Sequence, residues 1–427
     1  MSTKKILPCR VSGSLAMPPS KSVSHRMIIA ATLSEGTSTI RGVLLSDDIR
    51  ATVSACEALG AKISYTRQPR GLFKLSIVGC AMPKAAGKTI DCLESGSTLR
   101  FLIPIAGLDA KDTQFIGRGR LPERPLGPYH DAFSGTTLTL TKPDSKRELP
   151  LTLSGKLEHG VYHLPGDVSS QFVTGLLLAL PLVRGNSEII IDGPLESAPY
   201  VDITLDVMAA FGVHVDCDGY RRFIISGGQR YQSACLTVPG DWSQAAFFAA
   251  MASFGGTLHL TGLRPDDVQG DRVIVDILRQ MGGRLAYTKR GLFVSASDLR
   301  GIDIDVSACP DLVPILAVIG AAAKGTTYIV GAGRLRLKES DRLAAVTDTL
   351  SRLGAIIQSD ADSVRIDGGK PLFGGKVDAY NDHRIVMAMT AAASLCAHPV
   401  IIDGAEAVAK SYPDFFSDYK IIGGAAL

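Results

Sequence analysis

Lysine, serine and arginine side chains gather in one short stretch near the N-terminus, Pro18 to Arg26 (PPSKSVSHR). The apolar run from Met27 to Leu33 follows directly, so the stretch forms the first turn of a predicted helix. Free backbone N–H groups and the positive end of the helix dipole already favour an anion at such a turn, and Lys21 and an arginine add two cations. The stretch therefore predicts half of a phosphate or carboxylate clamp. The alternative is an ordinary capped helix with solvated cations.

The helix that carries this stretch is the first of a series. Runs with helical apolar spacing recur about every seventy residues, each opened by small polar residues and followed by a short strand that ends at a glycine. These predicted helices cover 22–36, 99–108, 171–183, 244–254, 312–323 and 384–395. Such self-similarity indicates one supersecondary unit used six times.

A second helix follows the strand in most units and ends at a glycine suited to a left-handed cap. These second helices are predicted at 47–59, 200–211, 270–281 and 339–353, with a shortened one at 126–133. Two further strands follow each of the longer ones. The unit is therefore β-α-β-α-β-β, and the fold class is α/β with mixed sheets.

The last unit stops after residues 415–419, before its final strands. We expect the N-terminal segment from Lys4 to Met17 to supply them. The first and last segments then share one discontinuous domain, residues 1–18 plus 239–427, with residues 19–238 inserted as the second domain. A length of 427 residues also favours two domains of about 200 residues each.

The composition favours a soluble, cytoplasmic protein. Hydrophobic residues make up 46% and charged residues 20%, and the formal net charge of +3 is too small for a general nucleic-acid surface. No apolar run approaches the roughly 20 residues that span a bilayer, and the N-terminus lacks the apolar core of a secretion signal. The eight cysteines form no C-x-x-C pair, so we expect reduced cysteines and no zinc site.

If the six units are equivalent, their first-helix starts form equivalent corners, and polar groups gather at these corners. They are Lys21, Ser22 and Arg26; Gly96, Ser97 and Arg100; Ser169, Ser170 and Gln171; Asp311; and Asp382, His383 and Arg384. Further ions lie in the predicted loops, at Arg124, from Lys338 to Arg342, and at Lys410. A purely structural repeat scaffold does not need these ions at its corners, so we predict an anion-binding site.

Six of these segments, in this order and spacing, resemble the 3-phosphoshikimate 1-carboxyvinyltransferases, the enolpyruvyl-shikimate-phosphate synthase family. They are PSKSVSHR (19–26), ERP (123–125), SSQF (169–172), KESDR (338–342), NDHR (381–384) and KSYPD (410–414). The resemblance covers nearly the whole chain, and six ordered motifs are far more specific than any one alone.

The resemblance implies transfer of the enolpyruvyl group of phosphoenolpyruvate to the 5-hydroxyl of shikimate 3-phosphate, with release of phosphate. It implies two inside-out α/β barrel domains of three units each, which close over the substrates, and neither a metal nor an organic cofactor. The inserted domain is then the shikimate 3-phosphate side and the discontinuous domain the phosphoenolpyruvate side. We expect a monomer that binds no nucleic acid and no membrane.

Carried over position by position, the resemblance assigns most of the corner residues to one substrate. Contacts to shikimate 3-phosphate are expected from Lys21, Ser22, Arg26, Ser169, Ser170, Ser197, Asp311 and Lys338, with Tyr200 as an additional candidate. Contacts to phosphoenolpyruvate are expected from Lys21, Gly96, Arg124, Gln171, Arg342, Arg384 and Lys410.

The implied chemistry adds a hydroxyl across an enol ether and then expels phosphate. A base must take the hydroxyl proton, and an acid must deliver a proton to the methylene carbon. Asp311 suits the base, and Glu339 or Lys21 the acid; the sequence leaves open which of them acts in each half-reaction. The alternative roles are a helix cap for Asp311 and a first-turn carboxylate for Glu339.

Two positions depart from the pattern of well-known family members. The second corner reads ESGSTLRF (94–101) in place of Asn-Ala-Gly-Thr-Ala-Met-Arg-Pro, but Gly96 keeps the small residue that the family associates with glyphosate inhibition, so we expect sensitivity. Arg334 stands where those members have an asparagine that touches the shikimate ligand, so that contact is not carried over.

Three alternative functions fit the sequence less well than enolpyruvyl transfer to shikimate 3-phosphate. The sister enzyme that transfers enolpyruvyl to UDP-N-acetylglucosamine carries a reactive cysteine in a loop that here reads GRGRLPER (117–124) and has none. An RNA-handling enzyme of related repeat units would need a basic track, which the charge does not favour. A non-catalytic repeat scaffold would not need the corner ions.

Overall fold

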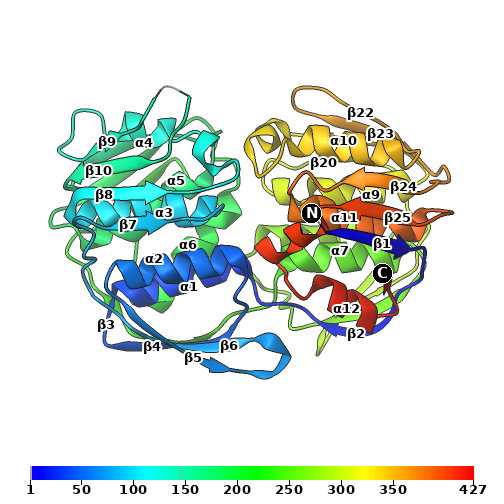
Figure 1. The fold of residues 1–427 in the computed structure, drawn as a ribbon, viewed down its shortest axis with the longest axis horizontal. Coiled ribbons are helices and arrows are strands. Elements are labelled where there is room, and N and C mark those ends of the chain that lie inside the picture. Colours follow the sequence, from blue (N-terminus) through cyan, green and yellow to red (C-terminus); the bar gives the residue numbers. More distant parts are fainter. Residues whose placement is uncertain (1, 145) are drawn as a thin grey trace. The chain divides into compact units, whose positions relative to one another are not determined.

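The computed structural model of the protein describes residues 2–144 and 146–427 (Figure 1). The chain forms two compact units. The inserted unit is Lys21–Val238, and the terminal unit combines the residues up to Ser20 with Pro239–Leu427. The two linking points are thus at 20/21 and 238/239.

The inserted unit alternates helices with short strands. Its helices are α1 (Lys21–Leu33), α2 (Asp47–Ala58), α3 (Gly96–Ala106), α4 (Gly127–Ala132), α5 (Ser170–Ala179) and α6 (Ala198–Ala210). Its strands are β3 (Ser34–Glu35), β4 (Thr37–Val43), β5 (Lys62–Arg67), β6 (Phe73–Val78), β7 (Thr89–Asp91), β8 (Ala110–Ile116), β9 (Thr139–Thr141), β10 (Leu151–Gly155), β11 (Val161–Pro165), β12 (Ser187–Asp192), β13 (Asp216–Asp218), β14 (Arg222–Ile225), β15 (Tyr231–Gln232) and β16 (Cys235–Thr237).

The terminal unit repeats this alternation. Its helices are α7 (Trp242–Ser253), α8 (Ile274–Gln280), α9 (Val313–Ala322), α10 (Arg342–Arg352), α11 (His383–Ala392) and α12 (Phe415–Ile421). Its strands are β1 (Thr3–Leu7), β2 (Ser12–Ala16), β17 (Thr257–Thr261), β18 (Arg284–Thr288), β19 (Gly291–Ser295), β20 (Asp303–Asp305), β21 (Gly325–Val330), β22 (Ile356–Ser359), β23 (Val364–Gly368), β24 (Gly375–Asp378), β25 (Val400–Asp403) and β26 (Ala425–Ala426).

The four-stranded sheets share one mixed topology. In the sheet β11-β12-β14-β13, β11 runs parallel to β12, and β14 is antiparallel to both β12 and β13. The sheet β20-β21-β23-β22 has the same pairing. A parallel pair needs a crossover connection, which α5 supplies between β11 and β12 and α9 between β20 and β21, while the hairpins β13-β14 and β22-β23 are closed by short turns. The predicted β-α-β-α-β-β unit is therefore confirmed.

The N-terminal segment serves two different sheets. Strand β1 pairs with β25 and β26, so it completes the sixth unit as predicted. Strand β2 instead runs parallel to β17 and supplies the first strand of the fourth unit. The prediction that the whole segment completes the sixth unit is wrong for β2. The sixth unit needs only one outside strand because the chain continues past α12 into β26.

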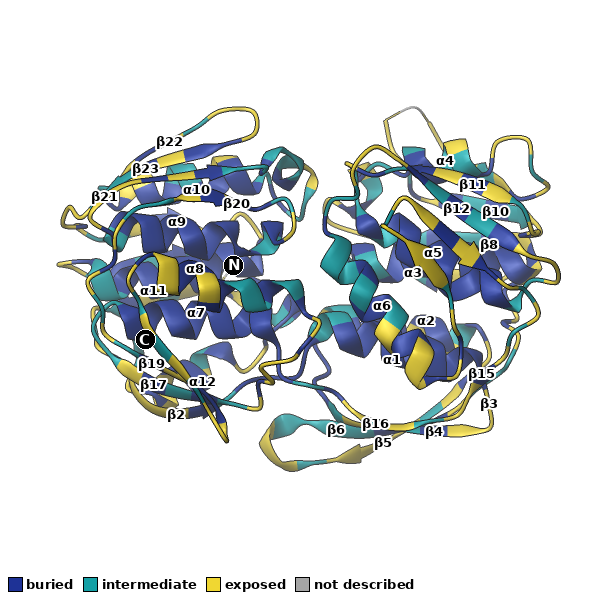
Figure 2. Cartoon of the chain, turned by 180° about the vertical axis from the view of Figure 1, so that it is seen from behind, coloured by how far each residue is buried: buried dark blue, intermediate teal, exposed yellow. Residues whose placement is uncertain are grey.

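The first helix of each unit lies in the core. Helices α7 and α11 are buried along their whole length, and α9 along all but its last residue, which fits their apolar residues on all sides (Figure 2). Strands such as β5 and β18 have exposed residues instead. Packing of α3 against α5 relies on Gly175, since a Cβ there would lie 2.2 Å from the Tyr129 hydroxyl and 2.4 Å from the Arg100 carbonyl oxygen. In the terminal unit, the starts of α7, α9 and α11 lie together, because Arg384 contacts both Ser243 and Asp311.

The described residues contain neither a disulfide nor a helix that could span a membrane. All eight cysteines are free thiols. Within residues 2–144 and 146–427, no helix has the length and apolar character needed to cross a membrane.

Candidate active site

The site residues of the terminal unit lie at helix starts. Asp382 caps α11 by accepting a hydrogen bond from the Arg384 N–H at 2.9 Å. Asp341 caps α10 by accepting one from the Ala344 N–H at 3.0 Å. Because these caps fix the first turns, Arg342 and Arg384 project from rigid helix ends rather than from mobile loops.

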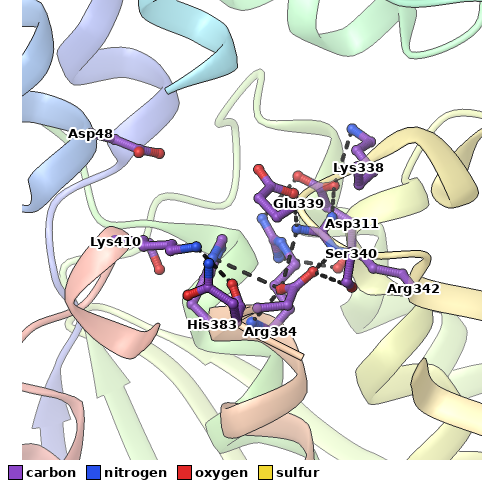
Figure 3. A network of polar contacts seen from close by, with 12 residues as sticks. Asp48, Asp311, Lys338, Glu339, Ser340, Arg342, His383, Arg384 and Lys410 are labelled. Carbon is purple, nitrogen blue, oxygen red and sulfur yellow. Dashed lines mark hydrogen bonds and ion pairs between the residues drawn. The ribbon is translucent and has the colours of Figure 1, made fainter. Parts of the chain in front are cut away.

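Arg342 is the centre of this cluster, and its side chain is only 1% exposed (Figure 3). Its Nε donates to Asp382 Oδ2 at 2.7 Å, its Nη1 to Asp311 Oδ1 at 2.8 Å, and its Nη2 to Glu339 Oε2 at 2.6 Å. Three carboxylates therefore surround one guanidinium. Although burial lowers it, these carboxylates hold the pKa of Arg342 above its ordinary value.

Asp311 joins Arg342 to two more cations. Arg384 Nη2 donates to Asp311 Oδ2 at 2.9 Å, and Lys338 Nζ lies 3.5 Å from Asp311 Oδ1. Asp311 belongs to the short 3-10 helix η6 (Pro310–Leu312), and Leu312 takes the N-cap position of α9. The alternative role of Asp311 as a helix cap is therefore wrong, because its carboxylate binds side-chain cations instead.

Lys338 and Glu339 lie in the loop between η7 (Gly333–Leu337) and α10. Burial lowers the pKa of Lys338 to about 8, an effect that Asp311 opposes and Arg342 reinforces. The predicted helix 339–353 starts three residues late, at Arg342, so Glu339 precedes the helix and pairs with Arg342 across the N-cap. Because Glu339 lies before the first turn of α10, its alternative role as a first-turn carboxylate is wrong.

Lys410 and His383 complete this side of the site. Lys410 lies at the end of η9 (Ala405–Lys410) and is 7% exposed, and its Nζ donates to the Asn381 carbonyl at 2.7 Å. His383 is buried, with its Nδ1 3.9 Å from Asp382 Oδ1. The terminal unit thus brings Asp311, Lys338, Glu339, Arg342 and Arg384 into one network and places Lys410 beside the α11 cap.

In the inserted unit, Lys21 begins α1. Its Nζ forms an ion pair of 2.7 Å with Asp48 Oδ2, in the first turn of α2. Arg26 is 2% exposed one turn further on, where its Nη1 donates to the Ser22 carbonyl at 2.8 Å and its Nη2 to the Tyr200 carbonyl at 2.9 Å. Burial lowers the pKa of Arg26 to about 9, which leaves the guanidinium charged at neutral pH.

A second cluster of the inserted unit surrounds Gly96 at the start of α3. Arg100 Nη1 donates to Gln171 Oε1 at 2.9 Å, and Gln171 Nε2 donates to Ser97 Oγ at 2.9 Å. A Cβ on Gly96 would lie 2.5 Å from Arg124 Nη1 and 2.9 Å from Arg100 Nη1. The absence of a side chain at Gly96 therefore lets two arginines and a glutamine converge.

The serines of the inserted unit lie at two more helix starts. Ser169 caps α5 by accepting a hydrogen bond from the Gln171 N–H at 3.3 Å, and Ser170 is the first residue of that helix. Ser197 is the N-cap residue of α6 and has a left-handed backbone, with a φ of 56°. Tyr200 follows in the first turn. A helix start carries backbone N–H groups that favour an oxyanion, and at these two starts serine residues lie beside them.

Known proteins resemble this chain over nearly its whole length. The chain matches the family EPSP synthase (3-phosphoshikimate 1-carboxyvinyltransferase) over residues 7–419. It belongs to the EPSP synthase family. The 3-phosphoshikimate 1-carboxyvinyltransferase of Clostridium kluyveri is 46% identical over 419 residues, which are 98% of this chain and 97% of the relative. That of Clostridium novyi is 45% identical and covers 99% of this chain and 98% of the relative.

Solved structures show the same two-domain inside-out α/β fold for this EPSP synthase family member. EPSP synthase from Acinetobacter baumannii superposes with a TM-score of 0.83 at 27% identity and covers 100% of both chains. The enolpyruvyl transferase NikO from Streptomyces tendae superposes with a TM-score of 0.78, covering 100% of this chain and 98% of that one. At 16% identity, that likeness concerns the fold alone. The predicted fold class and family are confirmed.

Several residues of the network were absent from the predicted site. Asp382, Ser243 and Asp48 bind side chains that the EPSP synthase family resemblance singled out, Ser340 binds Asp382, and Arg100 binds Gln171. Asp382 and Arg100 stood at predicted corners, so their position was a usable signal. Ser243 and Asp48 look like ordinary helix-start residues, and nothing in their local sequence distinguishes them from caps.

Proposed function

We propose that this chain transfers the enolpyruvyl group of phosphoenolpyruvate to the 5-hydroxyl of shikimate 3-phosphate and releases phosphate, as a step of aromatic amino-acid biosynthesis. The observation that carries the proposal is the network in which Arg342, Arg384 and Lys338 meet Asp311. It places cations for an anionic substrate within hydrogen-bond distance of a carboxylate that can act as a base. Membership of the EPSP synthase family supports the same reaction.

We assign each substrate the groups that suit its charges. Shikimate 3-phosphate would be held by Lys21, Ser22, Arg26, Ser169, Ser170, Ser197, Asp311 and Lys338. Phosphoenolpyruvate would be held by Lys21, Gly96, Arg124, Gln171, Arg342, Arg384 and Lys410. Arginine suits the second role because its planar fork binds a carboxylate or a phosphate through two parallel hydrogen bonds.

The proton transfers would use the carboxylates of the network. In the addition step, Asp311 takes the proton of the 5-hydroxyl while that oxygen bonds to C2 of phosphoenolpyruvate, and Glu339 or Lys21 protonates the methylene carbon C3. In the elimination step, the group that protonated C3 takes a proton back from the new methyl group, the C2–O bond to phosphate breaks, and the phosphate leaves with the proton that Asp311 had taken. The double bond forms again, so the atoms balance without any redox partner.

The protein's own carboxylates pair with the arginines of this network. Arg342 binds Asp311 and Glu339, and Arg384 binds Asp311, so the proposed anion-binding groups hold the proposed acid and base. An incoming phosphoenolpyruvate would compete for both guanidinium groups and release the carboxylates for proton transfer. Substrate binding would therefore activate the carboxylates, since a carboxylate paired with arginine is a weak base.

The decisive experiment measures phosphate release with both substrates and with each omitted. Release should require shikimate 3-phosphate as well as phosphoenolpyruvate; release from phosphoenolpyruvate alone would refute the transfer. Lys21→Ala and Asp311→Ala should lose activity, and Lys324→Ala, at an exposed pair with Asp298, is the matched control. We further propose that the enzyme is cytoplasmic and that it is a monomer. Light scattering of the purified protein would test its oligomeric state.

A further inference from the structure

A buried carboxylate outside the predicted site lies behind Arg384. Asp271 belongs to the short helix η5 (Gly270–Val273), which packs against α7, and it is only 4% exposed. Its carboxylate accepts a hydrogen bond from the Ser243 hydroxyl in the first turn of α7. Neither the family resemblance nor the reaction assigns these two residues a role.

Ser243 connects Asp271 to the anion-binding cluster. Arg384 Nη1 donates to Ser243 Oγ at 2.6 Å. A serine hydroxyl can donate one hydrogen bond and accept another. Because Asp271 takes the hydroxyl proton, a lone pair of Ser243 is left facing the guanidinium. The result is a relay from Asp271 through Ser243 to Arg384.

The Arg384 guanidinium contacts Asp311 as well as the relay. Arg384 Nη1 also donates to the Asp311 carbonyl at 3.1 Å, and Nη2 donates to Asp311 Oδ2 at 2.9 Å. When a substrate displaces the Asp311 carboxylate, the contact with Ser243 remains. The relay is therefore suited to keep Arg384 in position during the exchange of one anion for another.

The loop that carries Asp271 is fixed to the start of α7. Gln269 Nε2 donates to the Gly240 carbonyl at 2.8 Å, and the Trp242 N–H donates to Gln269 Oε1 at 3.3 Å. Asp267 accepts a hydrogen bond from the Gln269 N–H at 3.1 Å. These bonds order the backbone without using Asp271, so the carboxylate is available for the relay.

A charge at Asp271 is unfavourable for the fold by itself. Burial raises the pKa of its carboxyl, and the nearby Asp311 and Asp241 raise it further, while Arg384 and Ser243 lower it. A neutral acceptor would serve a purely structural serine at less cost, because a buried carboxylate loses its hydration. The unfavourable burial of this carboxylate has a reason if Arg384 needs a negative charge nearby.

We infer that Asp271 is a positioning residue that acts through Ser243 to hold Arg384 for phosphoenolpyruvate. The inference rests on the proposed role of Arg384. It concerns orientation only, since Asp271 reaches the substrate through two other side chains.

The test compares four variants: Asp271→Asn, Ser243→Ala, the double variant and Ser243→Thr. Each of the first two should raise the KM for phosphoenolpyruvate roughly tenfold, the effect of one lost hydrogen bond to a charged group. The KM for shikimate 3-phosphate should stay within about twofold. The double variant should be no worse than Ser243→Ala, because residues in one chain are not additive. Ser243→Thr keeps the hydroxyl and should retain the wild-type KM.

Asp267→Asn is the matched control, because Asp267 is a buried acid of the same loop that lies outside the relay. It should change thermal stability without changing the KM for phosphoenolpyruvate. Equal changes in both KM values, or additive effects in the double variant, would overturn the relay. If either single variant does not fold, the other decides.

Arg384→Lys separates this inference from the proposed function. If that variant raises the KM for phosphoenolpyruvate and the Asp271 and Ser243 variants do not, only the relay fails. If Arg384→Lys leaves that KM unchanged, both the role of Arg384 and the relay are overturned. The transfer reaction itself is judged separately, by phosphate release from the wild-type enzyme.

Discussion

Arg342 and Asp382 form an ion pair that is closed to solvent on both sides. Arg342 Nε lies 2.7 Å from Asp382 Oδ2, and the two side chains are 1% and 0% exposed. Asp382 also accepts a hydrogen bond from the Ser340 hydroxyl at 2.9 Å and caps α11. One carboxylate therefore sets the position of α10, of α11 and of the loop before α10.

Replacement of Asp382 by alanine should destabilise the terminal unit strongly. Arg342 would keep its charge in a buried place with one partner removed, and breaking such a pair costs about 3–5 kcal/mol. Urea unfolding of the variant measures this loss. The matched control is Asp348→Ala, which breaks the exposed Arg352–Asp348 pair of α10, also 2.7 Å long. That change should cost less than about 1 kcal/mol, and a similar cost for both variants would contradict the central role of Asp382.

A methyl group at Gly96 should weaken phosphoenolpyruvate binding. The new Cβ would meet Arg124 Nη1 at 2.5 Å and Arg100 Nη1 at 2.9 Å, so both flexible guanidinium groups would have to move away from the site. We expect Gly96→Ala to raise the KM for phosphoenolpyruvate roughly 10- to 100-fold, since small displacements of positioning groups have effects of this size. Thermal stability should change little, because the groups that move are side-chain ends.

The same variant tests the expected sensitivity to glyphosate. The wild-type enzyme should be inhibited competitively with phosphoenolpyruvate, and Gly96→Ala should be inhibited much less. Inhibition constants measured for both proteins decide the point. Gly127→Ala is the control, since a Cβ at Gly127 meets nothing within 4 Å. A wild-type inhibition constant far above the KM for phosphoenolpyruvate would contradict this prediction.

Features encoded locally could be predicted from the sequence. The small polar residues before each apolar run marked the start of α3, α5 and α7, because an N-cap is a contact between neighbours in sequence. The helical repeat likewise depends on apolar spacing within each segment. The place of β2 could not be predicted in this way, because pairing with β17 joins segments that lie far apart in the chain.

The internal neutralisation of the site was also beyond local reasoning. Arg342, Asp311 and Asp382 lie at least 31 residues apart in the chain, and only the packed fold brings them within hydrogen-bond distance. The cations at the corners of the repeats predicted an anion-binding site. The sequence could not show that the protein's own carboxylates form ion pairs with these cations. Asp271 was missed for the same reason, since its partner lies in another helix.

Binding of shikimate 3-phosphate should be linked to protonation of Lys338. Burial lowers the pKa of this lysine to about 8, so above pH 8 it loses its charge in the free enzyme. A bound phosphate favours the charged ammonium and raises that pKa again. Binding should therefore take up a proton at pH 8.5 and weaken as the pH rises further; near pH 6.5, Lys338 contributes no uptake because it is already protonated.

Calorimetry in buffers of different ionisation enthalpy measures this uptake directly. Lys338→Arg is the informative variant, because arginine keeps its charge throughout this range. It should bind shikimate 3-phosphate without the proton uptake at pH 8.5. Equal uptake by the variant and the wild type would assign the proton to another group.

The charge of Asp271 should lower the stability of the folded enzyme at neutral pH. Burial, together with Asp311 and Asp241, raises the pKa of this carboxyl to about 6, and Arg384 and Ser243 oppose the shift only in part. A raised pKa means that the folded state holds its proton more tightly than the unfolded state. This stabilising effect is fully present below about pH 4 and is lost as the pH rises to about 6.

Asp271→Asn carries no charge at any of these pH values, so its stability relative to the wild type should increase between about pH 4 and pH 6 and then stay constant. The melting temperatures of both proteins, measured in steps from pH 4 to pH 8, give this difference directly. A variant that is more stable than the wild type at neutral pH yet binds phosphoenolpyruvate less well would show that the charge at Asp271 serves the site at the expense of the fold. A difference in melting temperature that keeps rising up to pH 8 would mean that Asp271 is still protonated at neutral pH, and the charge argument for the relay would then fail.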